Sequence, residues 1–579
     1  MNFFPNQKPD KKDNLLESLK QLKGYFIYAA LFSASVNLLM LTPIMYMLQV
    51  YDRVVSSGSM TTLSMLTLLM LLLLVSSGGF EWVRSKLLIA ANVRLEESLR
   101  EQVSESSFKQ VLLTGDPNNS SRTMSDLIGL RQFVTGNGVF AIMDAPWTPI
   151  YIGVMFMFHP LFGLAAIITT IILIILALVS QKVATSKLAL AANLTGSAQS
   201  SFSSNLRNAE VIHGMGMAAN IRAKDNSLYA EACDEQANAS AVVGRLAAIS
   251  KSFRLISQSI LLGLGAYLAL RGQISPGMMI AGSLLLGRAL APIDLLVASW
   301  RGFVEAKAQF DRLRSALNTF PADSDRLSLP PPTGELSVEN LVVAPPLSRI
   351  ACLKGVSFKI SAGEALGIIG PSAAGKTSLA RAILGIWRAS SGAVRLDNAE
   401  IDKWDREELG PYLGYLPQDI ELFDGSIADN ICRFNNHESE KIIEAAEISG
   451  IHDMVLRLPE SYETRINASS GALSAGQRQR LGLARAIYGK PKLIVLDEPN
   501  SNLDEEGEHH LLSALQQLKE SGSTVIVITH RTPILALADK LLVLKNGLVA
   551  TFGARDEVIK SIHKANTNIT KLPQTAAPR

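Results

Sequence analysis

The sequence predicts two domains of different class: an α-helical domain with six membrane spans, then an α/β domain that carries a phosphate-binding P-loop. Three observations lead to this prediction. Only 18% of the 579 residues are charged, against about 25% in an ordinary soluble protein. Long uncharged runs occur only in the first 300 residues, whereas the second half alternates short apolar strands with amphipathic helices. The net charge of +3 is too small to predict a nucleic acid partner.

The first 23 residues are expected to form a cytoplasmic segment with one amphipathic helix, because Leu15, Leu16, Leu19 and Leu22 share a helical stripe. This helix could lie on membrane lipid or pack on protein, and the sequence leaves both readings open. Residues 24–316 are expected to form the membrane domain, because they contain six runs long enough or nearly long enough to cross a bilayer. The runs are 24–51, 61–80, 132–158, 160–181, 255–270 and 272–300.

Three charged residues interrupt these runs: Asp144 in the third, and Arg288 and Asp294 in the sixth. Charges are costly in lipid, so each is expected to face protein or a water-filled cavity. A role in lining a transport pathway and a structural role are equally open for each. Pro146 and Pro149 are expected to kink the third span beside Asp144.

The distribution of Lys and Arg predicts the orientation of the chain in the membrane. Residues 1–23, 81–137 and 181–254 carry five, seven and eight of them, whereas the connections at 52–59 and 271–276 carry one each. Because Lys and Arg concentrate on the cytoplasmic side, both termini and the two long loops are predicted to be cytoplasmic. The helix-rich composition of those loops predicts that the spans continue as helices beyond the membrane.

After a proline-rich linker at 317–334, residues 335–560 are predicted to form the α/β domain, and the polar tail 561–579 is predicted to be disordered. The P-loop should cradle phosphate with its backbone N–H groups, while Lys376 reaches the β- and γ-phosphates and the Thr377 hydroxyl binds Mg²⁺. An apolar strand before this loop and a helix after it fit the motif. The predicted nucleotide-binding residues here are Gly370, Pro371, Ser372, Ala373, Ala374, Gly375, Lys376, Thr377 and Ser378.

A second apolar strand, at 493–496, ends in a pair of carboxylates about 120 residues after the P-loop. Asp497 is expected to reach the Mg²⁺ site, and Glu498 is expected to orient or deprotonate the attacking water. A strand that ends in two carboxylates is weak evidence for this function by itself. Its occurrence together with a P-loop makes the evidence strong.

Between these two motifs, Leu473-Ser474-Ala475-Gly476-Gln477 resembles the signature of ATP-binding cassette proteins, which usually reads LSGGQ. The resemblance covers 335–560. It implies that ATP binds to Ser474, Ala475, Gly476 and Gln477 of a second copy of the chain. It also implies that Gln418 contacts nucleotide and Mg²⁺, that Asp504, in the loop after the catalytic Glu498, contacts nucleotide, and that His530 is the catalytic histidine near the γ-phosphate.

Three departures from the family pattern stand out. Ala475 replaces the second glycine of the signature. The stretch 343–346 has no aromatic residue to stack on adenine, and 466–470 lacks the glutamate that exporters tend to carry before the signature. Base stacking and one route of coupling between domains are therefore in doubt, and base selectivity is expected to be loose.

Six spans before one cassette resemble an exporter half-transporter. The stretches 47–54, 144–151 and 414–430 narrow the resemblance to inner-membrane ATPases of bacterial type I secretion, in the branch that exports metalloproteases and lipases. This implies a multi-pass homodimer that uses ATP and Mg²⁺ to export a protein with a C-terminal signal. Its implied partners are a periplasmic adaptor and an outer-membrane channel of the TolC type. Some relatives carry an extra peptidase-like N-terminal domain, for which the 23 residues before the first span leave no room.

Three alternatives remain at this stage. A lipid or drug exporter of the same fold competes most directly. A soluble cassette ATPase of DNA repair or translation would require the apolar half to be misread. A non-hydrolysing regulatory cassette is disfavoured because Lys376, Asp497, Glu498 and His530 are all present.

Overall fold

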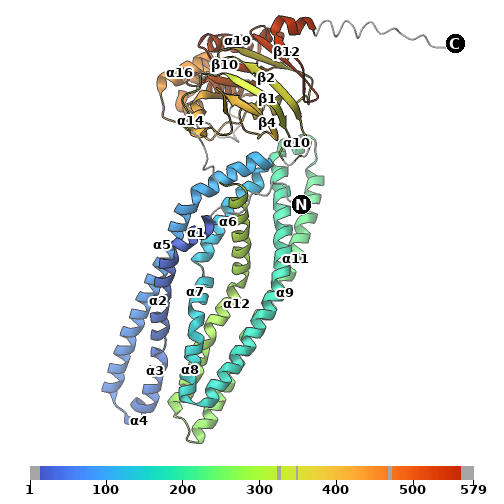
Figure 1. Ribbon diagram of the computed structural model, residues 1–579. Helices are drawn as coiled ribbons and strands as arrows, with labels where there is room; N and C mark the ends of the chain where they lie inside the picture. Colours follow the sequence, from blue (N-terminus) through green and yellow to red (C-terminus); the bar gives the residue numbers. More distant parts are fainter. Residues whose placement is uncertain (1–13, 322–327, 347, 349, 467–472, 562–579) are drawn as a thin grey trace, which may run out of the picture. The chain divides into compact units, whose positions relative to one another are not determined.

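The computed structural model describes residues 14–321, 328–346, 348, 350–466 and 473–561. The chain forms two compact units, one almost entirely helical and the other built on β-sheets (Figure 1). Residues 1–111 and 116–322 belong to the first unit, and residues 112–115 and 323–579 group with the second. Each unit is described by itself below.

Within the described residues of the first unit, six helical segments are long and apolar enough to cross a membrane, as the sequence predicted. Three of them are single helices, one is the first part of a longer helix, and two are broken. The segments are Lys23–Ser57, Met60–Thr114, Asn137–Phe158, Pro160–Arg207, Ala218–Leu270 and Pro276–Trp300. Their helices are α2 Lys23–Leu39, α3 Thr42–Gln49, the π-turn Val50–Val54, α4 Val55–Ser57, α5 Met60–Thr114, α7 Asn137–Asp144, α8 Thr148–Phe158, α9 Pro160–Arg207, α11 Ala218–Leu270 and α12 Pro276–Thr319.

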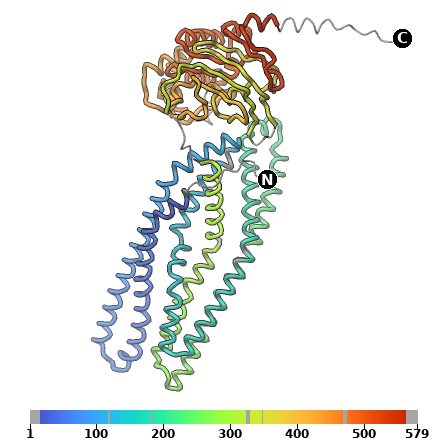
Figure 2. The backbone as a smooth tube through the Cα atoms, in the orientation of Figure 1, coloured from blue at the N-terminus to red at the C-terminus, as the bar shows by residue number. Residues whose placement is uncertain are grey.

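Several of these helices are far longer than a bilayer is thick. This confirms the prediction that the spans continue as helices beyond the membrane. α5 has 55 residues, α9 has 48 and α11 has 53, so each is about 70 to 80 Å long against a hydrocarbon core of about 30 Å. Figure 2 follows the chain from α9 through the short helix α10 (Ala209–Gly214) and back along α11, which packs against α9. The predicted amphipathic helix is α1 (Asn14–Gln21), whose Leu15 is buried. Leu15 packs with α5, α6 and α12 side chains, so its buried face contacts protein.

The third span differs from its predicted bounds. Residues 132–134 end the preceding helix α6 (Pro117–Val134), and the span begins at Asn137 because Gly136 takes an extended conformation with φ −85° and ψ 167°. The predicted irregularity beside Asp144 is present: a 3₁₀ turn at Ala145–Trp147 separates α7 from α8. A proline lies in this turn and another in the first turn of α8, where each is well tolerated.

The sixth span begins as its sequence predicted, with Ser275 as the N-cap of α12: its side chain accepts a hydrogen bond from the Met278 N–H at 3.1 Å. A second cap comes from the first span. Asp52, in the π-turn, accepts hydrogen bonds from the Ser275 hydroxyl at 2.5 Å and from the Gly277 N–H at 3.0 Å. α12 packs against α6, α7, α8, α9 and α11, and is thus the central helix of this unit.

The described residues of the second unit form three sheets. The largest has the strand order β12-β11-β3-β10-β9-β6, in which all neighbours are parallel except β12 with β11. A four-stranded antiparallel sheet has the order β2-β1-β4-β5, and β7 pairs with β8. The strands are β1 Leu336–Val343, β2 Leu353–Ile360, β3 Ala365–Ile369, β4 Ser391–Leu396, β5 Ala399–Glu400, β6 Leu413–Leu416, β7 Gly425–Ser426, β8 Arg465–Ile466, β9 Leu493–Asp497, β10 Thr524–Ile528, β11 Lys540–Lys545 and β12 Leu548–Ala554.

The central strands β9 and β10 are buried along their whole length, which explains their uninterrupted apolar sequences. Helices fill the connections. They are α13 Lys376–Ile383, α14 Arg406–Leu409, the 3₁₀ turn Gly410–Tyr412, α15 Ile427–Ile431, α16 Ser439–Ile448, α17 His452–Leu456, the 3₁₀ turn Ser461–Glu463, α18 Ala475–Ile487, α19 Glu505–Glu520 and α20 Thr532–Leu535. The neighbouring parallel strands β3, β9 and β10 end at one edge of the sheet, where the candidate site lies.

Candidate nucleotide-binding site

The P-loop connects β3 to α13, as its motif predicts. Gly370 must be glycine because a Cβ there would overlap the carbonyl oxygen of Leu544, and Gly375 takes φ +98°. Lys376 is buried, and its Nζ donates to the carbonyl oxygens of Gly370 and Pro371 at 2.7 and 3.1 Å. In this arrangement the ammonium group is folded over its own loop, at the N-terminus of α13, where an anion is stabilised.

Two of the three Mg²⁺ ligands predicted from sequence, Thr377 and Asp497, lie together. Asp497 ends β9, and the Thr377 hydroxyl donates a hydrogen bond to its carboxylate. Burial raises the pKa of Asp497, and the Thr377 hydrogen bond opposes that rise. Among the described residues, Asp497 Oδ2 has no hydrogen-bond partner. A buried carboxylate oxygen with a free lone pair beside a hydroxyl is the donor set that a hard cation prefers, so these residues fit Mg²⁺.

Glu498 follows in a left-handed conformation, with φ +50°. Its N–H donates to the carbonyl of Ile528 at 2.9 Å, which fixes this unusual backbone between β9 and β10. The predicted Gln418 lies beside it: Gln418 Nε2 donates to Glu498 Oε2 at 3.3 Å. The structure therefore brings four predicted residues into two adjacent pairs, Thr377 with Asp497 and Gln418 with Glu498.

Sequence reasoning assigned no role to Gln479, which supports the catalytic loop. Gln479 is buried in α18, and its Nε2 donates to the carbonyls of Glu498 at 3.4 Å and Pro499 at 2.9 Å. Its Oε1 accepts a hydrogen bond from Asn502 at 3.3 Å. The sequence offered one signal for this role: Gln479 is a polar residue on the apolar face of the helix that begins at the signature.

His530 follows β10 and is exposed. No hydrogen bond or ion pair of its side chain is recorded within the described part of the chain. The adjacent Thr529 is fixed instead, since its hydroxyl donates to Asn500 Oδ1 at 3.0 Å. The strand end positions His530, and its imidazole is left available to a ligand.

The signature residues form the N-terminus of α18. Ser474 is the N-cap, and its side chain and that of Gln477 make a reciprocal capping box, with hydrogen bonds of 3.2 and 2.8 Å. Ser474 and Ala475 are exposed, and the described residues of the cassette bring no P-loop residue into hydrogen bonding with them. The stretch 466–470 lacks the exporter glutamate, and all of it except Ile466 lies outside the described residues.

Asp504 is held within its own chain. It caps α19 by accepting the Gly507 N–H at 2.9 Å and pairs with Arg480 Nη2 at 2.9 Å. The Gly507 N–H holds the pKa of this carboxyl below its usual value. The predicted contact of Asp504 with nucleotide is not seen in this arrangement, and it stays a prediction.

The half-buried Arg433 connects the far end of the signature helix to the strand that precedes Gln418. Its guanidinium donates to the carbonyls of Arg485 at 3.0 Å and Ala486 at 3.1 Å, and to those of Gly410 and Leu413 at 2.9 and 2.8 Å. Burial lowers the pKa of Arg433 to about 10. The signature and the glutamine loop therefore share one rigid support.

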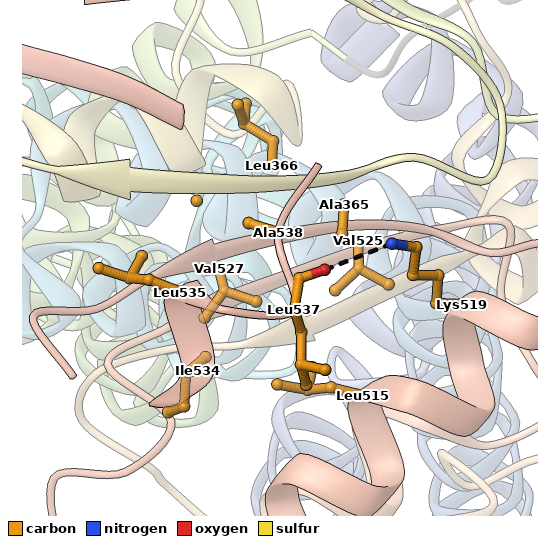
Figure 3. A pocket seen from close by; sticks show the side chains of 11 residues that line it. Ala365, Leu366, Leu515, Lys519, Val525, Val527, Ile534, Leu535, Leu537 and Ala538 are labelled. Atoms are coloured by element: carbon orange, nitrogen blue, oxygen red, sulfur yellow. Dashed lines mark hydrogen bonds between the residues drawn. The ribbon is translucent and has the colours of Figure 1, made fainter. Parts of the chain in front are cut away.

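A small cavity behind the large sheet is not part of this site. It has a volume of about 20 Å³, and Figure 3 shows it between β3, α19 and the 534–538 segment, with Lys519 Nζ donating to the Leu537 carbonyl at 3.4 Å. This volume holds about one water molecule. None of the predicted site residues lines it.

In the membrane domain the structure identifies a partner for Asp144 that sequence reasoning missed. Arg84 is buried in α5, and its Nη1 lies 3.1 Å from Asp144 Oδ1. Ser33 and Asn37 of α2 also donate to that oxygen, Asn37 at 2.7 Å. Arg84 is four residues past the second uncharged run and was counted with the cytoplasmic loop. Asp294, the other intramembrane carboxylate, pairs with Arg254 of α11 at 2.7 Å.

Comparison with known proteins agrees with both halves. A model of the ABC transporter family matches residues 353–501, and a model of the ABC transporter transmembrane region matches residues 26–291. The type I secretion system ATP-binding protein PrsD of Rhizobium meliloti (strain 1021) is 44% identical over 547 residues, which are 94% of each chain. The α-hemolysin translocation ATP-binding protein HlyB of Escherichia coli is 27% identical over 536 residues, covering 90% of this chain and 74% of the relative.

Among solved structures, a bacterial Atm1-family ABC exporter with ATP bound matches 96% of this chain and 99% of its own with a TM-score of 0.78. Its 21% identity makes this a likeness of fold. The transmembrane match and the six spans do not support the soluble alternative. The chain belongs to the ABC transporter family, as a multi-pass exporter half-transporter of type I secretion that binds nucleotide and couples ATP hydrolysis to protein export.

Proposed function

We propose that two copies of this chain act together in the bacterial inner membrane, each with both termini in the cytoplasm. ATP would bind between the P-loop of one copy and Ser474–Gln477 of the other. The observation that carries this proposal is that the signature and the other predicted site residues of one cassette are not joined to each other. Thr377, Asp497, Gln418 and Glu498 lie in bonded pairs, whereas no hydrogen bond joins them to the signature, with its exposed Ser474 and Ala475, among the described residues. A second copy would complete the site.

The roles of the residues follow from their positions. Lys376 would release its two carbonyl partners and bind the β- and γ-phosphates. Mg²⁺ held by Thr377, Asp497 and Gln418 would neutralise charge on the phosphate oxygens. Glu498 would orient or deprotonate the attacking water, and His530 would hold the γ-phosphate.

The cargo proposal follows the type I secretion relatives. The exported molecule would be a protein with a C-terminal signal, of the metalloprotease or lipase class, and export would require a periplasmic adaptor and a TolC-type outer-membrane channel. Lipids would surround the spans and would not be transported. Stimulation of ATP hydrolysis by lipids or drugs, with cargo peptides inert, would favour the lipid or drug exporter instead.

The substitution Glu498→Gln tests the site. It keeps the shape of the side chain and removes its ability to accept a proton, so hydrolysis should fall by about 100-fold or more while ATP still binds. The full-length protein should then accumulate as an ATP-bound dimer, measured by size-exclusion chromatography with light scattering and by bound nucleotide. Glu506→Gln, at an exposed position in α19, is the matched control and should behave as wild type. Undiminished hydrolysis in Glu498→Gln would remove Glu498 from this role.

A further inference from the structure

The membrane domain contains a cavity of about 270 Å³ between α2, α5, α7, α8 and α12. Apolar residues line part of it, and two cations, two carboxylates, two amides and a phenol line the rest. These polar residues are Asn37, Glu81, Arg84, Asn137, Asp144, Tyr151 and Arg288. A cavity this polar within membrane-spanning helices calls for an occupant that can form hydrogen bonds.

The groups at one side of the cavity satisfy one another. Arg84 lies 3.1 Å from Asp144 and 3.7 Å from Glu81. Asn37 donates to Asp144 at 2.7 Å, and the Tyr151 hydroxyl donates to the Asn37 carbonyl at 2.9 Å. Arg84 is therefore the counter-charge of both carboxylates that line the cavity, Glu81 and Asp144.

Arg288 is different. It lies near the middle of the span Pro276–Trp300, and no hydrogen bond or ion pair of its side chain is recorded within the described residues. Four residues later Pro292 has no N–H to offer to the Arg288 carbonyl, so the helix at this point also has a free acceptor. The guanidinium carries five donors in a planar fork and remains charged. It is exposed on the cavity side of α12 and has no counter-charge of its own.

We infer that this cavity binds acidic side chains of the polypeptide in transit, with the Arg288 guanidinium as the group that receives the carboxylate. This inference rests on the proposed export of protein and names one place where the cargo is held. A carboxylate matches the guanidinium fork with two parallel hydrogen bonds. The volume favours a single side chain, because 270 Å³ is below the range of pockets that enclose drug-sized ligands and far too small for a two-chain lipid.

The test uses the full-length protein, free of nucleotide, in nanodiscs of phosphatidylcholine. The probes are two fluorescent Gly/Ser peptides with amidated C-termini, one containing glutamates and the other glutamines at the same positions. The glutamate peptide should bind about tenfold more tightly by fluorescence anisotropy. Arg288→Gln should abolish this preference, and Arg288→Lys should restore part of it, since a lysine keeps the charge and loses the fork.

Arg271→Ala is the matched control: it removes one cation from the end of the neighbouring span, where Arg271 stacks on Tyr267, and should leave the preference intact. An equal preference in wild type and Arg288→Gln would overturn the inference. So would loss of the wild-type preference in nanodiscs that contain phosphatidylglycerol, because a lipid phosphate would then be the occupant.

The same preparations separate this inference from the proposed function. Wild-type protein that hydrolyses ATP but does not distinguish the peptides would overturn the cavity site alone. Protein that distinguishes the peptides but does not hydrolyse ATP would overturn the proposed function alone.

Discussion

Two largely buried carboxylates, one in each domain, show how the same chemical group is put to different use. Asp144 in the membrane domain accepts hydrogen bonds from Arg84, Ser33 and Asn37. Asp497 in the cassette receives the Thr377 hydroxyl and keeps Oδ2 without a partner among the described residues. The first is fully bonded by its own chain. The second is not.

The difference follows from what each carboxylate must do. A charge in the membrane is costly unless it is paired, so three side chains from two other helices, α2 and α5, bond Asp144. A metal ligand must keep a lone pair available, and the cassette accepts an unfavourable, desolvated carboxylate for that reason. An unbonded oxygen in a buried acid therefore indicates a ligand, and a fully bonded one indicates a structural joint.

Removing the cation of the ligand site should have the largest effect on activity. Lys376→Ala removes the ammonium group that would bind the β- and γ-phosphates, and ATP hydrolysis should fall by about 100-fold or more. The stability of the nucleotide-free protein should change little, because the recorded hydrogen bonds of this lysine go to carbonyls of its own loop. Phosphate release and thermal unfolding measure the two effects. Lys545→Ala, at an exposed position in β11, is the control, and equal loss of activity there would contradict the assignment.

Removing the cation of the structural joint should lower stability. Arg84→Ala leaves Asp144 buried without a counter-charge, at a cost of about 3 to 5 kcal/mol. Thermal unfolding of the membrane domain in detergent measures it. The double variant Arg84→Met with Asp144→Asn should recover much of the loss, since neither charge then remains. A double variant as unstable as Arg84→Ala would show that the pair is not the joint.

The smallest expected effect concerns the base of the nucleotide. The segment 343–346 at the end of β1 carries no aromatic residue, so phosphate and Mg²⁺ contacts should supply most of the affinity. ATP and GTP should then be hydrolysed with kcat/KM values within about fivefold of each other, because a stacked aromatic contributes only about 1 kcal/mol. A strict preference for ATP would mean that another group reads the base.

The cassette site was predictable because its residues lie in short contiguous motifs. Each ends a strand or begins a helix, and local spacing alone places Lys376, Thr377 and Asp497. Gln479 escaped because it acts through backbone carbonyls 19 and 20 residues away, which no local pattern reveals.

The membrane domain was predictable only as hydrophobic spans and one broken helix. Arg84 and Asp144 are 60 residues apart, and their pairing depends on how α5 and α7 pack. Asp52 likewise lies in a stretch that supported the family resemblance. Its hydrogen bond with Ser275, the cap of α12, joins residues that are 223 positions apart, and no pattern in the sequence predicted it.

The contrast between the structural carboxylate and the ligand carboxylate is tested most directly by thermal unfolding. The melting temperatures of Asp497→Asn and Asp144→Asn are compared in the nucleotide-free, full-length protein. Burial disfavours the charge of Asp497, so Asp497→Asn should unfold within about 2 °C of wild type or above it, yet lose ATP hydrolysis. Asp144→Asn leaves the buried Arg84 with only the exposed Glu81 as a counter-charge, at 3.7 Å, and should unfold at least about 5 °C lower. A drop in Asp497→Asn as large as that in Asp144→Asn would contradict the account, because Asp497 would then be a structural joint as well.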